Sequence, residues 1–289
     1  MKILILSDLH ISANTVSSQF KLDKLKRTFQ NQINEEYDMV IISGDVFEHN
    51  VIKYINVFDT LKFIFDNKNV VFCLGNHEFA FEHYDSVIVN YKKMYEDFIK
   101  NEENKNSNIC CLDINNYFDF EDSRVVGNVF WYDWSLNNNR TLMKGEIVDG
   151  WLDSTIENFD PLKEHDKCKK QIFDNIDEKK NMILVTHMVP HIDLNTFNHE
   201  DPYSIYNSYS GEKDFLKEIQ SKNFKLAFCG HTHRKEIREI RNIKCFNIGN
   251  DYFFRTNKID WIILQVDKNL NIEKVQTRDY SCNMPMNNN

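Results

Sequence analysis

The sequence "LAFCGHTHRKE" at residues 226–236 decides how the chain is interpreted, because an apolar run ends there in a glycine and two histidines. A short apolar run bounded by a turn residue is typical of a buried β-strand. Gly230 allows a tight turn and a close approach of the backbone to a bound group. Side chains two residues apart point to one side of an extended backbone, so we expect His231 and His233 to face one point. The stretch therefore predicts a strand that ends at a chemical site.

Four other apolar runs end in the same way, with a polar side chain that can bind a metal ion. These are residues 2–7 before Asp8 and His10, 38–43 before Asp45, 69–74 before Asn76, and 181–186 before His187. Three of the eight glycines directly precede such a side chain, at Gly44, Gly75 and Gly230. In open α/β sheets, ligands gather beyond the carboxyl ends of the strands. We therefore expect all five strand ends to meet at one site.

Amphipathic segments between the apolar runs predict the fold class. Strands are also predicted at 109–114, 124–130 and 225–230, and helices at 21–35, 51–67, 84–100, 163–178 and 211–221. Strands that alternate with helices are typical of α/β layers with a partly parallel sheet. Four C-terminal runs without helices between them predict an antiparallel or mixed sheet, at 235–241, 243–248, 259–266 and 272–278. We therefore expect two packed sheets with helices outside them.

The composition is that of a globular chain, with 289 residues, 42% hydrophobic residues and a net charge of -9. An acidic balance disfavours non-specific binding to nucleic acid or to an anionic membrane. No stretch approaches the roughly 18 consecutive apolar residues of a membrane helix. The seven cysteines form no CxxC pair or regular framework, which favours buried thiols in a reducing compartment. We therefore expect a cytoplasmic protein with no membrane partner.

We expect one domain over residues 1–280, followed by a flexible tail at 281–289. A segment at about 131–160 interrupts the alternation of strands and helices, and we interpret it as an insertion over one edge of the fold. It is rich in aromatic residues, which include Trp131, Tyr132, Trp134 and Trp151.

The candidate ligands are two aspartates, one asparagine and a set of histidines, and thus offer both oxygen and nitrogen donors. Imidazole with carboxylate suits manganese, iron, zinc, cobalt or nickel, whereas all-oxygen sites suit calcium and magnesium. The donors are too many for one ion, so we expect two. A pair of ions roughly 3.5–4 Å apart is a known device for hydrolysis. His165 and His199 follow no predicted strand, and we expect them at the surface.

The order of these motifs resembles that of the calcineurin-like metallophosphoesterase superfamily. The motifs are D-x-H at 8–10, G-D at 44–45, G-N-H-E at 75–78, T-H at 186–187 and G-H-T-H at 230–233. The resemblance implies a four-layer αββα sandwich of two mixed sheets flanked by helices. It also implies two metal sites that share Asp45. One ion would be held by Asp8, His10, Asp45 and His233, and the other by Asp45, Asn76, His187 and His231.

The same resemblance implies a reaction. His77 is similar to the family's histidine that binds no metal and acts as a general acid or stabilises the transition state, a role that suits imidazole because its pKa lies near the working pH. The expected reaction is hydrolysis of a small phosphomonoester or phosphodiester by in-line attack of a metal-bridging hydroxide. The expected cofactors are two divalent transition-metal ions, manganese first, with iron, zinc, nickel or cobalt as alternatives.

Two departures from the family pattern narrow the function. Protein phosphatases of the family usually continue G-D with an aspartate, an arginine and a glycine, whereas this chain reads "GDVFEHN" at 44–50. The double-strand-break nuclease branch usually has aspartate where Glu48 and Glu78 stand. A metal-dependent nuclease acting on DNA or RNA is the alternative, although the acidic balance and the lack of a basic stripe disfavour it. A non-catalytic binding protein on the same fold is the third hypothesis.

Overall fold

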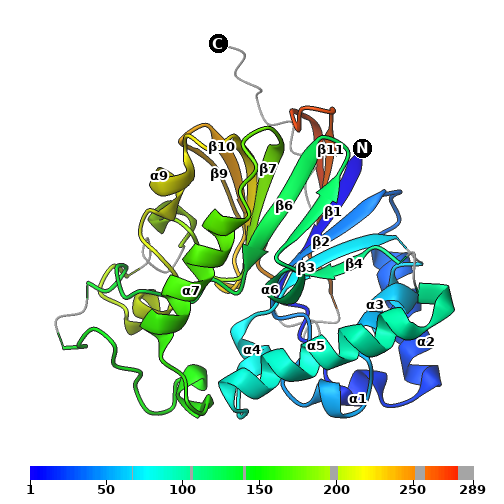
Figure 1. Ribbon diagram of the computed structural model, residues 1–289, viewed down its shortest axis with the longest axis horizontal. Coiled ribbons are helices and arrows are strands. Elements are labelled where there is room, and N and C mark those ends of the chain that lie inside the picture. The colour runs from blue at the N-terminus through cyan, green and yellow to red at the C-terminus, as the bar shows by residue number, and fades with distance from the viewer. Residues whose placement is uncertain (67, 105–106, 139–140, 196–200, 251–257, 279–289) are drawn as a thin grey trace.

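Two six-stranded mixed sheets form the centre of the molecule (Figure 1). The computed structural model describes residues 1–289 except 67, 105–106, 139–140, 196–200, 251–257 and 279–289. His199 and the predicted tail at 281–289 therefore lie outside the described residues, and the single domain over 1–280 stays a prediction.

The first sheet has the strand order β12-β11-β1-β2-β3-β4. Its strands are β1 Lys2–Leu6, β2 Met39–Ser43, β3 Asn69–Cys73, β4 Ile109–Cys111, β11 Ile262–Val266 and β12 Ile272–Thr277. Strands β1 to β4 are parallel, whereas β11 pairs antiparallel with both β1 and β12. The carboxyl ends of β1, β2 and β3 therefore lie at one edge of this sheet.

The second sheet has the strand order β5-β6-β7-β8-β10-β9. Its strands are β5 Tyr117–Phe120, β6 Ser123–Asn128, β7 Asn181–Thr186, β8 Phe224–Cys229, β9 Glu236–Ile240 and β10 Ile243–Asn247. The central strands are parallel, and the edge strands β5 and β9 are antiparallel to their neighbours.

The four C-terminal runs do not form one sheet of their own, which corrects the sequence-based expectation. Strands β9 and β10 extend the second sheet, whereas β11 and β12 extend the first. The physical reason is that an apolar run indicates a buried strand but does not indicate which strand it pairs with. Strand pairing depends on contacts between residues distant in sequence.

Alternation along β1 explains how the layers are held together. Ile3 and Ile5 pack between the two sheets, in one cluster with Val185 of β7. Leu4 and Leu6 point to the other face, into the cluster shared with the helices. Because successive side chains alternate across a strand, both faces of the sheet are buried. Each fully buried aliphatic side chain stabilises the fold by roughly 1.5–3 kcal/mol.

Helices flank both sheets and complete the four layers. In Figure 1, α2, α3 and α5 lie beside the first sheet, and α7 and α9 lie beside the second. The α-helices are α1 Ala13–Val16, α2 Gln19–Gln32, α3 Val57–Ile64, α4 Asn76–Phe79, α5 Tyr84–Lys100, α6 Leu112–Asn115, α7 Pro161–Asp174 and α9 Phe215–Ile219. The 3₁₀ helices are η1 Val51–Lys53, η2 Glu102–Asn104, η3 Leu152–Thr155, η4 Ile192–Leu194 and η5 Ile205–Tyr209. The predicted sandwich of two mixed sheets flanked by helices is confirmed.

Two predicted elements are each divided into two shorter elements. The predicted helix at 51–67 is instead the short helix η1 followed by α3. The second helix begins afresh because the Asn56 side chain caps it and accepts a hydrogen bond from the Phe58 N–H at 3.0 Å. The predicted strand at 109–114 ends at Cys111, where α6 begins.

The described cysteines are all buried and free, as expected for packed thiols, and they are Cys73, Cys110, Cys111, Cys168, Cys229 and Cys245. Cys282 lies outside the described residues. Within the described ranges, no helix combines the length and the apolar character needed to cross a bilayer.

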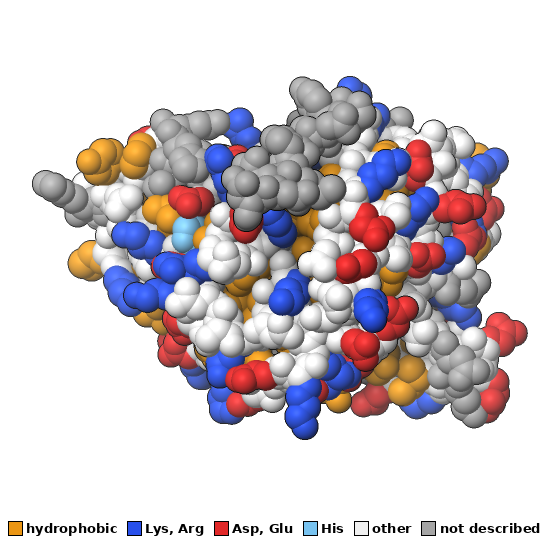
Figure 2. Space-filling view, turned by 90° about the horizontal axis from the view of Figure 1, so that it is seen from above, with side chains coloured by type: hydrophobic (Ala, Val, Ile, Leu, Met, Phe, Trp, Pro, Cys, Tyr) orange, Lys and Arg blue, Asp and Glu red, His pale blue; other side chains and the backbone are white. Residues whose placement is uncertain are grey.

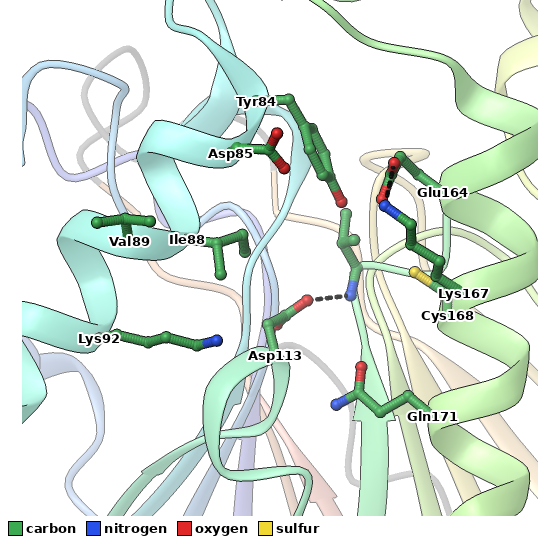
Figure 3. Close-up of a pocket in the computed structure, with 11 residues that line it drawn as sticks. Tyr84, Asp85, Ile88, Val89, Lys92, Asp113, Glu164, Lys167, Cys168 and Gln171 are labelled. Atoms are coloured by element: carbon green, nitrogen blue, oxygen red, sulfur yellow. Dashed lines mark hydrogen bonds and ion pairs between the residues drawn. The ribbon is translucent and has the colours of Figure 1, made fainter.

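A cavity of about 430 Å³ lies between α5 and α7 (Figure 3). Asp113 lines it, and its two carboxylate oxygens accept hydrogen bonds from the backbone N–H groups of Leu74 at 2.7 Å and Val129 at 2.9 Å. Leu74 follows β3 and Val129 follows β6, so this carboxylate ties the first sheet to the second. Burial raises the pKa of Asp113 to about 6. The predicted metal ligands do not line this cavity; they lie at the strand ends.

Candidate metal centre

Backbone hydrogen bonds join the loops that follow the strands. The Asp8 N–H donates to the Gly44 carbonyl at 3.1 Å, and the His10 N–H donates to the Asp45 carbonyl at 2.9 Å. Within the second sheet, the Gly230 N–H donates to the His187 carbonyl at 3.0 Å, and across the two sheets the His231 N–H donates to Asp8 Oδ1 at 3.0 Å. The loops of both sheets therefore form one surface, on which the predicted ligands converge.

Two groups of side chains place their donor atoms within 4.8 Å of one another: Asp8, His10 and His233, and Asp8, Asp45 and His187. Asp45 Oδ2 lies 3.7 Å from His10 Nε2 and 3.4 Å from His187 Nε2. One carboxylate oxygen therefore faces a histidine of each group. This arrangement can place two ions next to a shared carboxylate.

Asn76 and His231 lie beside the second group. Asn76 Oδ1 is 3.1 Å from His187 Nε2, so the amide oxygen faces the same point as the imidazole. The His231 ring lies edge-on to the His187 ring, with 5.1 Å between centroids, and its backbone N–H donates to Asp8 Oδ1 at 3.0 Å. His231 belongs to none of the groups of donor atoms within 4.8 Å of one another among the described residues.

The three glycines leave room that no other residue would leave. A Cβ atom at Gly75 would overlap the Asp45 carboxylate, and one at Gly230 would overlap the Ser7 hydroxyl and the Asp8 carboxylate. Gly44 has a φ of +80, and a Cβ there would overlap the His187 ring. The glycines therefore allow the close packing of loops around the donors that the sequence predicts.

The backbone that carries the ligands is not extended, which corrects the reason given for the paired motifs. Asp8, His10, Asp45, His231 and His233 have positive φ angles of 51, 46, 48, 67 and 52. These angles fall in the left-handed region, which non-glycine residues rarely adopt and which can mark a functional site when several such residues lie together. Both members of each pair still reach the cluster, since the His10 and His233 rings stack with 5.3 Å between centroids.

Backbone carbonyls fix the orientation of two histidines. His187 Nδ1 lies 3.0 Å from the Ser43 carbonyl oxygen, and His233 Nδ1 lies 2.6 Å from the Asn250 carbonyl oxygen. A carbonyl oxygen only accepts, so Nδ1 carries the hydrogen in each ring. The Nε2 lone pair is then directed at the cluster, which is the usual arrangement of a histidine that binds a metal.

The electrostatics of the cluster also fit a cation. Burial opposes the charge on Asp45, but His187 and His77 outweigh it and hold the pKa of Asp45 well below its ordinary value. Burial likewise opposes protonation of His187, and the charge of Asp45 raises its pKa to about 10. Burial and the neighbouring His187 lower the pKa of His231 well below its ordinary value. Without a metal ion, protonated His187 thus offsets the charge of Asp45, a role that a bound divalent ion would take over once Nε2 has lost its proton, and the mixed donor set fits divalent transition-metal ions.

His77 lies at the rim of the cluster and is held by Glu48. Its Nδ1 lies 3.3 Å from Glu48 Oε2, and its backbone N–H donates to Asp45 Oδ1 at 3.0 Å. Glu48 Oε1 also lies 3.2 Å from His10 Nδ1. Burial lowers the pKa of His77, but Asp45 and Glu48 outweigh this and raise it to about 9. In the sequence, Glu48 was notable only as a departure from a family pattern, and its contact with His77 was not predicted.

Glu78 has a structural role. Its Oε1 accepts a hydrogen bond from the Phe47 N–H and its Oε2 accepts one from the Gly75 N–H, both at 2.8 Å. The carboxylate therefore joins the loop after β2 to the loop after β3, which explains a glutamate at the end of the G-N-H-E motif.

Asp153 is a residue of the site that the sequence did not reveal. Its Oδ1 accepts a hydrogen bond from Asn76 Nδ2 at 2.9 Å. Its Oδ2 accepts from the Tyr132 hydroxyl at 2.9 Å and from Trp151 Nε1 at 3.0 Å. Because the amide nitrogen of Asn76 is engaged by Asp153, the amide oxygen is directed at the cluster. The only signal in the sequence was an aspartate within an aromatic segment.

The aromatic segment at 131–160 packs into the protein. Trp131 and Tyr132 are fully buried, and Trp134 is nearly so. Trp131 packs on Phe159 with 4.3 Å between ring centroids. These buried aromatic residues therefore anchor the segment that carries Asp153. The prediction for His165 was wrong, since this residue is 3% exposed and its Nδ1 is hydrogen bonded to the Trp131 carbonyl.

Comparisons with known proteins agree with this geometry. A family model described as calcineurin-like phosphoesterase matches residues 1–235. Among solved structures, the chain is similar to the phosphopantetheinyl hydrolase of Mycobacterium tuberculosis, with a TM-score of 0.56, 13% identity, and coverage of 88% of this chain and 93% of that chain. It is also similar to the TT1561 protein of Thermus thermophilus, with a TM-score of 0.54, 12% identity, and coverage of 96% and 97%. At these identities the likeness concerns the fold alone. No curated protein sequence matches the chain.

Proposed function

The chain belongs to the calcineurin-like phosphoesterase family, and we propose that it hydrolyses a small phosphomonoester or phosphodiester with two divalent transition-metal ions. The observation that carries the proposal is the position of Asp45 Oδ2, which faces His10 Nε2 and His187 Nε2 within 3.7 Å and 3.4 Å. A carboxylate oxygen between two sets of donors supports a centre of two adjacent ions.

The proposed ligands are those that the family resemblance implies, and the donor distances at the strand ends support them. Asp8, His10, Asp45 and His233 would hold one ion, and Asp45, Asn76, His187 and His231 would hold the other. We propose manganese as the first candidate, with iron, zinc, nickel and cobalt as alternatives, because imidazole with carboxylate accepts all of them. When bound, two such ions lower the pKa of a coordinated water and offset the charge of the phosphoryl oxygens.

His77 is proposed to supply a proton to the leaving oxygen. Glu48 lies next to its Nδ1 and stabilises the charged imidazolium. Its Nε2 lies 3.9 Å from Asp45 Oδ2, on the side of the cluster, and its side chain is 17% exposed. The ring can therefore reach both the proposed centre and a substrate that enters from solvent.

A small substrate is favoured over a nucleic acid by the surface charge. On the face shown in Figure 2, acidic and basic side chains are interspersed over the described residues. A protein that binds nucleic acid through its backbone usually presents a basic stripe. The six buried free cysteines support the further proposal that the enzyme works in the cytoplasm.

The function is tested by removing metals with a chelator and reloading the full chain with each candidate ion. We expect manganese-dependent release of p-nitrophenol from mono- or bis-p-nitrophenyl phosphate. Labelled single- and double-stranded DNA and RNA, digested in parallel, identify a nuclease. Failure of the loaded protein to act on any of these substrates would favour a non-catalytic binding protein and would refute the proposal.

A further inference from the structure

A second cluster of histidine and carboxylates lies outside the proposed centre. Asp133, His165 and Glu212 each place one donor atom within 4.8 Å of the others. Asp133 follows β6, His165 lies on α7, and Glu212 lies between η5 and α9. His165 and Glu212 are both buried, with 3% and 7% of their surfaces exposed. Three separate segments therefore bring polar groups to one buried point beside the aromatic segment.

The orientation of His165 points to a cation. Its Nδ1 is hydrogen bonded to the Trp131 carbonyl, which only accepts, so Nδ1 carries the hydrogen. Its Nε2 faces Glu212 Oε2 at 3.1 Å. In a neutral ring this nitrogen is a lone pair opposite a negative oxygen, which is unfavourable in a buried site unless a proton on Nε2 or a metal ion bound by both atoms offsets the repulsion.

Glu212 gives an independent indication. Its Oε2 atom is buried and makes no hydrogen bond among the described residues, and its contact at ion-pair distance is His165 Nε2. Its other oxygen, Oε1, lies 3.3 Å from Lys169 Nζ, which also contacts Glu218 Oε1 at 2.6 Å. Lys169 therefore offsets part of the charge of Glu212 while Oε2 remains directed at the cluster. A buried carboxylate oxygen without a hydrogen bond is costly unless an ion satisfies it.

The loops that carry the two carboxylates are fixed in place. The Ser135 N–H donates to Asp133 Oδ1 at 2.8 Å, and the Lys213 N–H donates to Ser135 Oγ at 2.7 Å. The Glu212 N–H donates to the Val189 carbonyl at 3.0 Å. The three donors are therefore held in position by the fold, as in a site that is formed before its ion binds.

We propose that Asp133, His165 and Glu212 bind a third divalent transition-metal ion, for which Zn²⁺ is a suitable probe. One imidazole nitrogen and two carboxylate oxygens suit zinc or manganese, and three protein ligands leave a position for water. The ion would join the aromatic segment, α7 and the segment before α9. The three residues of this site are not among the proposed ligands of the two ions of the proposed function.

The test counts zinc ions in the metal-stripped and reloaded full chain, by mass spectrometry under native conditions. Three ions are expected in the wild-type chain, and two in Glu212→Gln and in Asp133→Asn, which keep the side-chain volume. Glu218→Gln is the matched control, because Glu218 contacts the same Lys169 but is no member of the cluster. It should keep three ions.

Two further measurements separate this site from the proposed centre. In Asp45→Asn, added zinc should still raise the thermal unfolding temperature, and adding Glu212→Gln should abolish that rise. A zinc-soaked crystal should show an anomalous peak between His165 Nε2 and Glu212 Oε2, which decides the matter even if a variant does not fold. Equal zinc counts in the wild type and Glu212→Gln, or no such peak, would overturn the proposal and assign the cluster to a protonated histidine paired with a glutamate.

Discussion

The loops at the strand ends and the aromatic segment at 131–160 both reach the proposed metal centre, but they contribute in different ways. The loops carry the donors themselves, each directly after a buried strand. The segment contributes Asp153, which lies 77 residues from Asn76 and acts on it through a hydrogen bond. A candidate ligand can therefore be recognised from its neighbours in the sequence, whereas the orientation of its side chain depends on residues far along the chain.

The largest effect is expected from the loops. Asp45→Asn keeps the shape of the side chain but removes the charge that faces both histidine groups. We expect both ions of the centre to be lost and activity to fall to background, a loss greater than the roughly 10–100-fold that follows when only a supporting residue is changed. Metal analysis after manganese loading checks this. Unchanged loading of the centre would contradict the shared role of Asp45.

His77→Ala separates binding from catalysis within the loops. We expect both ions to remain, because His77 is not among the proposed ligands, and the rate to fall by roughly 10²–10⁴-fold. Metal content and turnover of a p-nitrophenyl ester are measured together. His49→Ala is the matched control, since His49 Nδ1 lies 4.0 Å from Glu48 and shares the rim. An equal loss in both variants would argue against a specific role for His77.

Asp153→Asn tests whether the aromatic segment acts through orientation. The variant removes the charged acceptor of the Asn76 amide and keeps its volume, so we expect manganese affinity to fall by roughly 10–100-fold. Saturating manganese should restore most of the activity. Asp149→Asn, at an exposed position of the same segment, is the control. A loss of activity that saturating manganese does not restore would mean that Asp153 takes part in the reaction. It would then contradict the division between loops that carry the donors and a segment that only orients them.

The smallest effect is expected from Trp151→Phe. This change removes the N–H that donates to Asp153 at 3.0 Å but keeps a ring that can stack on Tyr209. Asp153 keeps its contacts with Asn76 and Tyr132, so the manganese affinity should fall by less than about tenfold, in line with one lost hydrogen bond. An effect as large as that of Asp153→Asn would mean that the ring itself shapes the centre.

The layers could be predicted from the sequence, and the candidate donors could be named from it, because both have local signals. His187 stands directly after the apolar run of β7, and the alternation of strands and helices indicates the sandwich. The pairing of β11 with β1 was not predicted, because the residues at 259–266 do not indicate which strand they pair with. Asp153 and the burial of His165 were not predicted either, since each depends on a contact with a residue far along the chain. The left-handed backbone of Asp8 and His10 was hidden as well, because these residue types do not demand it.

The positive φ angles at the ligands have an evolutionary consequence. Each such non-glycine residue reduces folding stability by of order 1–3 kcal/mol, and five of them crowd into one surface. A laboratory selection for heat resistance alone would therefore enrich glycine at Asp8, His10 or His233. Such variants should be more stable but should lose the proposed metal centre, so stability and the proposed function would be selected in opposite directions at these positions.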